Sequence, residues 1–120
     1  MDEHTSVQEL KNLVRGFSDE RDWDQYHNPK DLAIGVVTEA GELLQLFRFK
    51  SPNESEKMFS SPDARKKIRN EVADVFYFLL RFCDKNGIDV SSALKEKLEE
   101  NAQKYPAEKF KGSNKKYDEL

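Results

Sequence analysis

Two acidic pairs lie within apolar helical segments, and their placement restricts the fold more than any other feature of the chain. The pairs are Glu39 with Glu42 and Glu71 with Asp74. Residues three apart on a helix share one face. The other residues on these two faces are apolar: Leu32, Val36, Leu43 and Leu46 with the first pair, and Ile68, Val75, Phe78 and Phe82 with the second. Because carboxylates among core residues are costly unless they are neutralised, a divalent cation is the simplest candidate partner.

Spacing alone does not identify a site, because 23 acidic residues among 120 produce such pairs by chance. Glu96 and Glu99 have the same spacing, but their neighbours on the helical face are polar, so this pair is interpreted as solvated surface. The alternative for the pairs at 39–42 and 71–74 is that their acids form ion pairs with lysine or arginine at the rim of a bundle.

Apolar residues recur at helical spacing in four segments. The predicted helices run from Ser6 to about Arg21, from Asn28-Pro29 to about Phe49, from Ser61-Pro62 to about residue 86, and from Asp89 or Ser91 to before Pro106. A capping residue followed by proline is a strong helix start. With no persuasive strand signal, the sequence predicts an all-α four-helix bundle. Its two acid-bearing helices, placed antiparallel, could bring the four carboxylates together.

The remaining segments are polar. Residues 50–61 are expected to form a mobile loop, and residues 107–120 a lysine-rich segment that is disordered or extended. A chain of 120 residues is large enough for a single core. We therefore expect one domain at residues 1–110 and a polar C-terminal tail at 111–120.

Composition restricts the class of partner. The net charge of −3 and the isoelectric point of about 5.5 disfavour binding to a nucleic-acid polymer, which normally requires a basic surface. No apolar run reaches membrane-spanning length, and the N-terminus lacks the basic start and apolar core of a signal peptide. The single cysteine, Cys83, cannot form an internal disulfide. These features predict a cytoplasmic protein without membrane partners.

Four carboxylates supply only oxygen ligands, which favour hard cations such as Mg²⁺, Mn²⁺ or Ca²⁺. A ferritin-like di-iron site requires Glu-x-x-His pairs, and neither His4 nor His27 completes one. Zinc is disfavoured because the chain has no Cys/His cluster. Carboxylate-held Mg²⁺ usually also binds substrate phosphates. Together with the two segments described next, these acids point to a nucleotide as the ligand.

Two further segments offer groups for a nucleotide. The polar connection at 19–28 contains aromatic side chains: Trp23, Tyr26 and His27. They could pack on the core or form a stacking platform for a base. Three polar residues lie along one edge of the last predicted helix: Lys97, Asn101 and Lys104. They form either a solvated face or a set of phosphate contacts.

The motifs, in this order, resemble the MazG superfamily of all-α nucleoside triphosphate pyrophosphohydrolases. The Glu-x-x-Glu and Glu-x-x-Asp pairs are similar to its metal-binding signature. Residues 17–32, which include Glu-Arg-Asp-Trp-Asp-Gln-Tyr-His, resemble the dCTP pyrophosphatase branch, as does Lys-x-x-x-Asn-x-x-Lys-Tyr-Pro at 97–106. The similarity covers about residues 7–110.

This resemblance implies hydrolysis of a nucleoside triphosphate between its α and β phosphates, with a monophosphate and pyrophosphate as products. The implied Mg²⁺ ligands are Glu39, Glu42, Glu71 and Asp74. Either Glu39 or Glu71 would act as general base. The implied substrate contacts are Trp23 and His27 for the base and Lys97, Asn101 and Lys104 for phosphate or sugar. Members of the family form dimers or tetramers with composite sites, so a homodimer or homotetramer is expected.

Two positions depart from the branch. Phe49 stands where tryptophan is usual, and Phe78 where tyrosine is frequent; both belong to the family's base pocket. The predicted substrate is dCTP or a modified pyrimidine dNTP, and the catalytic core is better supported than the choice of cytosine. Two other hypotheses are a helical regulatory module that binds a nucleotide or metal without turnover, and a structural protein whose acids form surface salt bridges.

Overall fold

The computed structural model describes residues 1–115, and every regular element in that range is a helix. In chain order the elements are η1 (Asp2–His4), α1 (Val7–Glu20), η2 (Asp24–Tyr26), α2 (Pro29–Gln45), α3 (Pro52–Lys57), η3 (Met58–Ser60), α4 (Pro62–Lys85), α5 (Val90–Lys104) and α6 (Ala107–Phe110). The predicted all-α class is confirmed. None of the described helices is both long enough and apolar enough to span a bilayer.

Each of the four long helices begins after a side chain that accepts a hydrogen bond from the backbone three residues later. These caps are Ser6, Asn28, Ser61 and Asp89. The predicted helix starts are therefore confirmed. In α2 and α4 a proline follows the cap, where its missing N–H removes no helical hydrogen bond. Such a cap contributes about 1 kcal/mol, so the local sequence fixes where the two acid-bearing helices begin.

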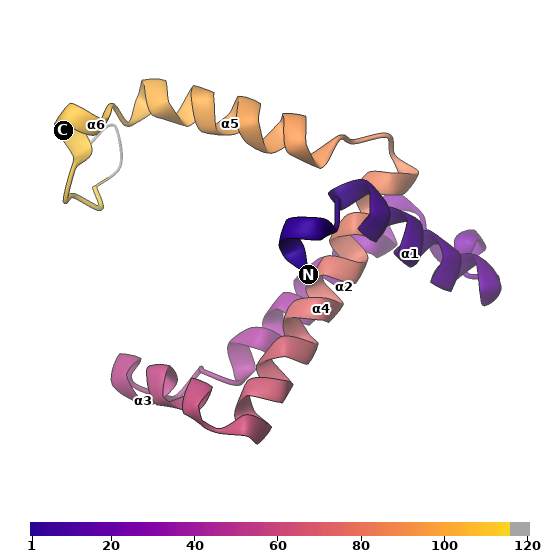
Figure 1. Ribbon diagram of the computed structural model, residues 1–120, viewed down its shortest axis with the longest axis horizontal. Helices are drawn as coiled ribbons and strands as arrows, with labels where there is room; N and C mark the ends of the chain where they lie inside the picture. The colour runs from indigo at the N-terminus through magenta and orange to yellow at the C-terminus, as the bar shows by residue number, and fades with distance from the viewer. Residues whose placement is uncertain (116–120) are drawn as a thin grey trace. The chain divides into compact units, whose positions relative to one another are not determined.

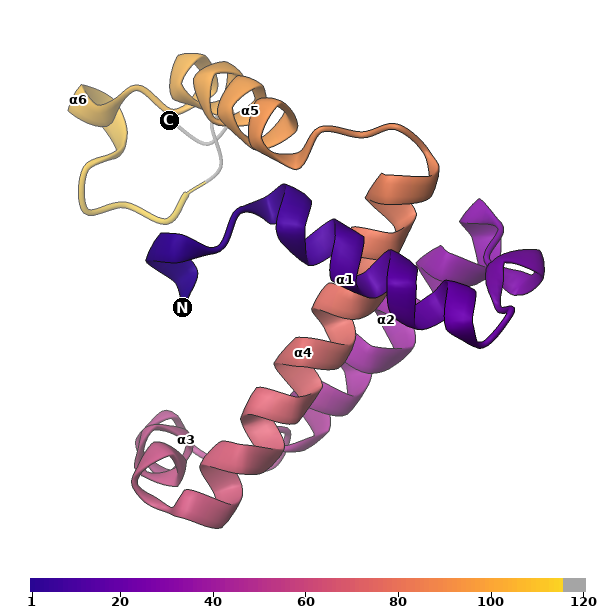
Figure 2. The same ribbon diagram turned by 45° about the vertical axis from the view of Figure 1, so that its right-hand side comes forward.

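The chain divides into two compact units, Met1–Gly87 and the residues from Ile88 onward. The first unit is built on α2 and α4, which run antiparallel side by side (Figure 1). Helix α1 packs across α4 (Figure 2). The most buried apolar side chains come from the central pair: Leu32, Ile68, Leu80 and Cys83. Antiparallel packing brings the second half of α2 beside the first half of α4, and these halves carry the acids.

The prediction of an irregular loop at 50–61 is wrong, because α3 and η3 occupy most of that segment. The hydroxyl of Ser51 accepts from the Glu54 amide at 3.1 Å, and the Glu54 carboxylate accepts from the Ser51 amide at 3.2 Å. This reciprocal capping box, with a proline at the first helical position, starts a helix in a polar sequence. The segment therefore joins α2 to α4 as an ordered helical connection.

Helix α2 ends at Gln45, earlier than the predicted end near Phe49, and residues 46–49 form turns. In the second unit, α6 occupies residues that were expected to be disordered or extended. Residues 116–120 of the predicted tail lie outside the described residues. The completion of a four-helix bundle by α5 stays a prediction.

Candidate active site

Three of the four predicted metal ligands meet where α2 packs on α4. One carboxylate oxygen from each of Glu39, Glu42 and Glu71 lies within 4.8 Å of the other two. Glu39 and Glu71 are half-buried, whereas Glu42 is exposed. Asp74 lies outside this group, one turn further along α4, but its negative charge contributes to raising the pKa of both Glu39 and Glu71. The two acid-bearing faces inferred from the sequence therefore converge.

Two oxygens in this group are buried without a hydrogen bond. Oε2 of Glu39 and Oε2 of Glu71 have no partner among the described residues. Burial raises the pKa of Glu39 to about 7, and the hydrogen bond and charge of Glu42 add to this effect. Burial also raises the pKa of Glu71, again with a contribution from Glu42. An unpaired buried polar group is destabilising, so a bound cation would stabilise these carboxylates.

Lysine and arginine do not neutralise these acids in the described part of the chain. None of the ion pairs within residues 1–115 includes any of the four. Acids elsewhere in the same unit do pair, as Asp84 does with Arg15. The alternative of salt bridges at a bundle rim therefore has no support here. The oxygen-only donor set, with two unsatisfied oxygens, fits a hard divalent cation such as Mg²⁺.

A hollow of about 410 Å³ lies beside Asp74. Its lining residues are Phe17, Trp23, Ala73, Asp74, Tyr77 and Phe78. It thus joins one predicted metal ligand to two predicted base contacts, Trp23 and Phe78. A larger hollow of about 580 Å³ elsewhere along α4 includes none of the four acids, so size does not distinguish the site.

The aromatic rings around this hollow pack edge to face. Phe17 lies 5.7 Å from Trp23 and 5.8 Å from Tyr77 between ring centroids, and Tyr77 lies 5.2 Å from Phe78. The sequence analysis missed Phe17 and Tyr77 as site residues. The helical spacing of Phe17 indicated only a core position, and nothing local distinguished Tyr77 from its apolar neighbours.

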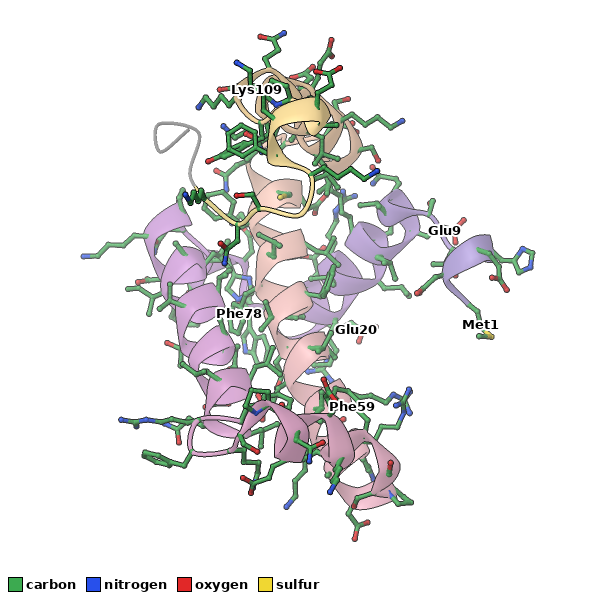
Figure 3. The ribbon with its side chains drawn as sticks, turned by 90° about the vertical axis from the view of Figure 1, so that its left-hand side faces the viewer. Met1, Glu9, Glu20, Phe59, Phe78 and Lys109 are labelled. Atoms are coloured by element: carbon green, nitrogen blue, oxygen red, sulfur yellow. The ribbon has the colours of Figure 1, made fainter. Side chains whose placement is uncertain are left out.

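The ring of Phe78 lies directly against the backbone of α2 at Gly35. A Cβ atom on Gly35 would overlap Cδ1 of Phe78, because it would lie far closer than two non-bonded carbons can approach. Figure 3 shows Phe78 on α4 pointing toward α2. A glycine inside a helix is unfavourable by about 1 kcal/mol relative to alanine, but here the missing side chain makes room for the ring. Gly35 thus fixes how Phe78 lies in the wall of the hollow.

The loop that carries Trp23 and His27 is attached to α4 by two cations. Arg81, whose side chain is only 3% exposed, donates from Nη2 to Oδ1 of Asp24 at 3.0 Å and from Nε to Nδ1 of His27 at 3.0 Å. Lys85, one turn later, donates to the backbone carbonyl of Asp24 at 3.1 Å. The sequence analysis missed Arg81, although an isolated arginine in the apolar half of a helix is a signal for a buried ion pair.

The family follows from similarity to known proteins. The sequence profile of the MazG-like family matches residues 34–120, which is well over half of the chain. The chain belongs to the MazG-like family. The resemblance inferred from the motifs is therefore confirmed.

Individual MazG-like relatives agree with this assignment. The chain is 33% identical to human dCTP pyrophosphatase 1 over 115 residues, which are 96% of this chain and 68% of that protein. The bovine dCTP pyrophosphatase 1 is 31% identical over the same shares. A solved pyrophosphatase from Archaeoglobus fulgidus is 36% identical with a TM-score of 0.79, covering 86% of this chain and 94% of that one. The predicted enzyme class, a nucleoside triphosphate pyrophosphohydrolase, is confirmed.

The remaining predicted substrate residues are Phe49, which follows α2, and three residues on α5. Phe49 follows the end of α2, is 89% exposed and does not line the hollow beside Asp74. Lys97 and Lys104 are exposed on α5 and lie 3.4 and 3.7 Å from Glu100. These lysines and the half-buried Asn101 belong to the second unit. Their approach to the substrate stays a prediction.

Proposed function

We propose that this MazG-like enzyme hydrolyses dCTP or modified pyrimidine deoxynucleoside triphosphates in a Mg²⁺-dependent reaction. Cleavage between the α and β phosphates would give the monophosphate and pyrophosphate and would remove such nucleotides from the cytoplasmic pool. The observation that carries the proposal is the pair of buried, unpartnered oxygens on Glu39 and Glu71. The relatives that are dCTP pyrophosphatases support the choice of nucleotide.

The residues that would hold the cation are Glu39, Glu42 and Glu71, with Asp74 as a fourth ligand. Mn²⁺ should substitute for Mg²⁺, because both accept oxygen ligands. When bound, such a cation stabilises charge on the phosphates and lowers the pKa of the attacking water. The exposed side of Glu42 leaves the cluster open to a triphosphate from solvent.

Glu39 is one candidate for the general base, because its buried Oε2 has no hydrogen-bond partner among the described residues and could accept a proton. The water oxygen would form a bond to one of the two phosphorus atoms that share the α–β bridging oxygen. The bond from that phosphorus to the bridging oxygen would break, and the water proton would pass to the Glu39 carboxylate. Glu71, whose buried Oε2 likewise has no hydrogen-bond partner among the described residues, is the alternative acceptor of this proton.

The base would occupy the hollow beside Asp74. Stacking on an aromatic ring contributes about 1–3 kcal/mol per base, and Trp23 and Phe78 both present rings there. Phe78 lacks the hydroxyl of a tyrosine, and the hydroxyl of Tyr77 already forms a 2.6 Å hydrogen bond with Ser18. Stacking is therefore expected to dominate these contacts. Phe49 is the further base contact in this proposal, and the phosphate and sugar contacts are Lys97, Asn101 and Lys104.

The enzyme would act as a homodimer or homotetramer. Three apolar residues at helical spacing on α2 remain exposed: Ile34 at 51%, Val37 at 72% and Leu44 at 61%. A second copy of the chain that covers this face would bury them. Mass measurement in solution by light scattering tests this part of the proposal.

The experiment that tests the activity is incubation of the full chain with each dNTP and Mg²⁺, followed by chromatography. We expect monophosphate and pyrophosphate, with the largest rate for dCTP or a modified pyrimidine nucleotide. The Glu42→Gln and Asp74→Asn variants should each lose activity by more than about a hundredfold, the upper end of what the loss of an outer-shell partner costs, while keeping their helix content. Glu99→Gln removes an exposed acid from the pair on α5 and is the matched control. Full activity of Glu42→Gln and Asp74→Asn, or nucleotide binding without turnover by the wild type, would instead support a non-catalytic module.

A further inference from the structure

We infer that Arg81 fixes His27 as the neutral tautomer with its proton on Nε2. The hollow beside Asp74, called the base hollow from here on, would then have a hydrogen-bond donor for the nucleotide. Arg81 is then a positioning residue that acts through His27 and sets which edge of the base is accepted. The part that concerns the nucleotide rests on the proposed function.

The tautomer follows from one hydrogen bond. Nε of Arg81 lies 3.0 Å from Nδ1 of His27. A guanidinium is always protonated and offers only donors, so Nδ1 must be the acceptor and carries no proton. A neutral imidazole has one donor and one acceptor nitrogen, and the hydrogen bond at one nitrogen determines the state of the other. The single proton of His27 therefore lies on Nε2.

The guanidinium cannot easily turn away from His27, because carboxylates hold its other nitrogens. Nη2 lies 3.0 Å from Asp24 and 3.9 Å from Asp19, and Nη1 lies 3.7 Å from Asp84. Asp84 is itself held by Arg15, whose Nε donates to it at 2.8 Å. Since the planar fork has fixed donor directions, any rotation that releases His27 also breaks these ion pairs.

A positive charge on His27, next to the charges of Arg81 and Lys85, is disfavoured in this environment. Burial lowers the pKa of His27, and the positive charges of Arg81 and Lys85 lower it further, whereas Asp24 acts in the opposite direction. The neutral ring with a defined tautomer is therefore the form that a ligand meets near neutral pH.

His27 does not itself line the base hollow, but it packs against two residues that do. Its ring packs edge to face against Trp23 at 6.3 Å and Tyr77 at 6.4 Å, and both of those residues line the hollow. The only hydrogen bond of the His27 side chain within residues 1–115 is the one at Nδ1. Nε2–H is thus available to a ligand.

A donor at this position requires an acceptor on the base. Cytosine presents acceptors at O2 and N3, while its 4-amino group is a donor that would be left unpaired against Nε2–H. A cytosine bound in this hollow would therefore turn its O2 or N3 edge toward His27 and its amino group away. A base lacking an acceptor at this edge leaves Nε2–H desolvated and unpaired, which weakens binding.

The direct test is a long-range proton–nitrogen NMR correlation of the His27 ring in the full chain. We expect an unprotonated Nδ1 and a protonated Nε2 in the wild type. On titration the Nε2 resonance should shift with dCMP and stay unchanged with deoxyribose 5-phosphate, which has the phosphate and sugar but no base. A protonated Nδ1 in the wild type, or an Nε2 resonance that dCMP leaves unmoved, would overturn the inference.

Arg81→Lys keeps the positive charge but loses the planar guanidinium, so His27 should become a mixture of its two neutral tautomers. The KM for dCTP should rise by up to about tenfold with little change in kcat, as expected for the loss of one hydrogen bond in binding. Lys85→Met is the matched control, because it removes the other cation at Asp24 and leaves the bond to His27 intact. An unchanged tautomer and KM in Arg81→Lys would contradict the positioning role. The NMR measurements need no turnover, so a lack of dCTP hydrolysis would remove the proposed function and leave the tautomer assignment intact.

Discussion

The first unit contains two clusters of buried charge, and they differ in whether the charges have partners. Arg81 is almost fully buried, yet its guanidinium nitrogens contact His27, Asp24 and Asp84. In the other cluster, Glu39 and Glu71 each bury an oxygen that has no hydrogen-bond partner among the described residues. Arg81 and Glu71 lie a few turns apart on α4, but only the first has its charged atoms matched by partners. We infer that the two clusters have different roles.

The pKa shifts of the carboxylates differ in the same way. The hydrogen bond from Arg15 holds the pKa of Asp84 below its ordinary value, and the hydrogen bond from Lys85 does the same for Asp24. In the acid cluster, burial and neighbouring negative charges raise the pKa of Glu39 and Glu71. The paired cluster stabilises the fold, and the unpaired cluster is destabilising until a ligand compensates it.

The largest effect is expected from a substitution that disrupts the paired cluster around Arg81. Arg81→Met should lower the free energy of unfolding by about 3 kcal/mol, because it removes the hydrogen bonds of the buried guanidinium to His27 and Asp24, and a hydrogen bond to a charged group contributes about 1.5–3 kcal/mol. Glu71→Gln should have the opposite sign and raise the stability of the metal-free protein, because it removes one of several repelling charges. Urea unfolding of both variants measures the two effects. Destabilisation of similar size in both variants would show that the two clusters play the same structural role.

A smaller effect is expected where the hollow meets α2. Gly35→Ala should cost about 1–3 kcal/mol, since the added Cβ overlaps the ring of Phe78 and forces it to move. The displaced ring should also raise the KM for dCTP. Gly16→Ala is the control, because nothing lies within 4 Å of a Cβ there, and it should stabilise the protein by about 0.4–1 kcal/mol. Thermal melting that ranks Gly35→Ala above the wild type would contradict the close contact.

The smallest effect is a dependence of stability on pH. The folded pKa of Glu39 is about 7 against an ordinary value of 4.5, so the unfolded chain releases this proton first as pH rises. Glu39 therefore makes the metal-free protein less stable as pH increases from about 4.5 to 7. His27 acts in the opposite direction, because its lowered pKa makes the fold less stable as pH falls below 6.5.

The difference in melting temperature between Glu39→Gln and the wild type isolates the effect of Glu39. It should grow by a few degrees across that pH interval and shrink when Mg²⁺ is added. A difference independent of pH would show that the Glu39 carboxylate is not shifted.

The convergence of Glu39, Glu42 and Glu71 was predictable because its signal is local. Capping residues such as Asn28 fix the register of each helix, and helical spacing then places Glu39 and Glu42 on one face. The short helix α3 also had a readable capping box at Ser51, but its few residues show no apolar periodicity, and the polar composition indicated a loop.

The partners of Arg81 were not predictable, because they come from distant parts of the sequence. Asp24 and His27 lie 57 and 54 positions away, and the pairing depends on how α4 packs against the loop at η2. Tyr77 is similar, since its hydrogen bond is to Ser18, 59 positions away. Composition and spacing indicate which residues suit a site, whereas these long-range contacts depend on tertiary packing.

Mn²⁺ titration followed by electron paramagnetic resonance is the most direct test of the claim that the unpartnered acids hold a divalent cation. The wild type and Glu99→Gln should remove the signal of free Mn²⁺ equally well. Glu39→Gln and Glu71→Gln should bind the ion much more weakly at the same protein concentration. Equal Mn²⁺ binding by all four proteins, or none by the wild type, would contradict the account.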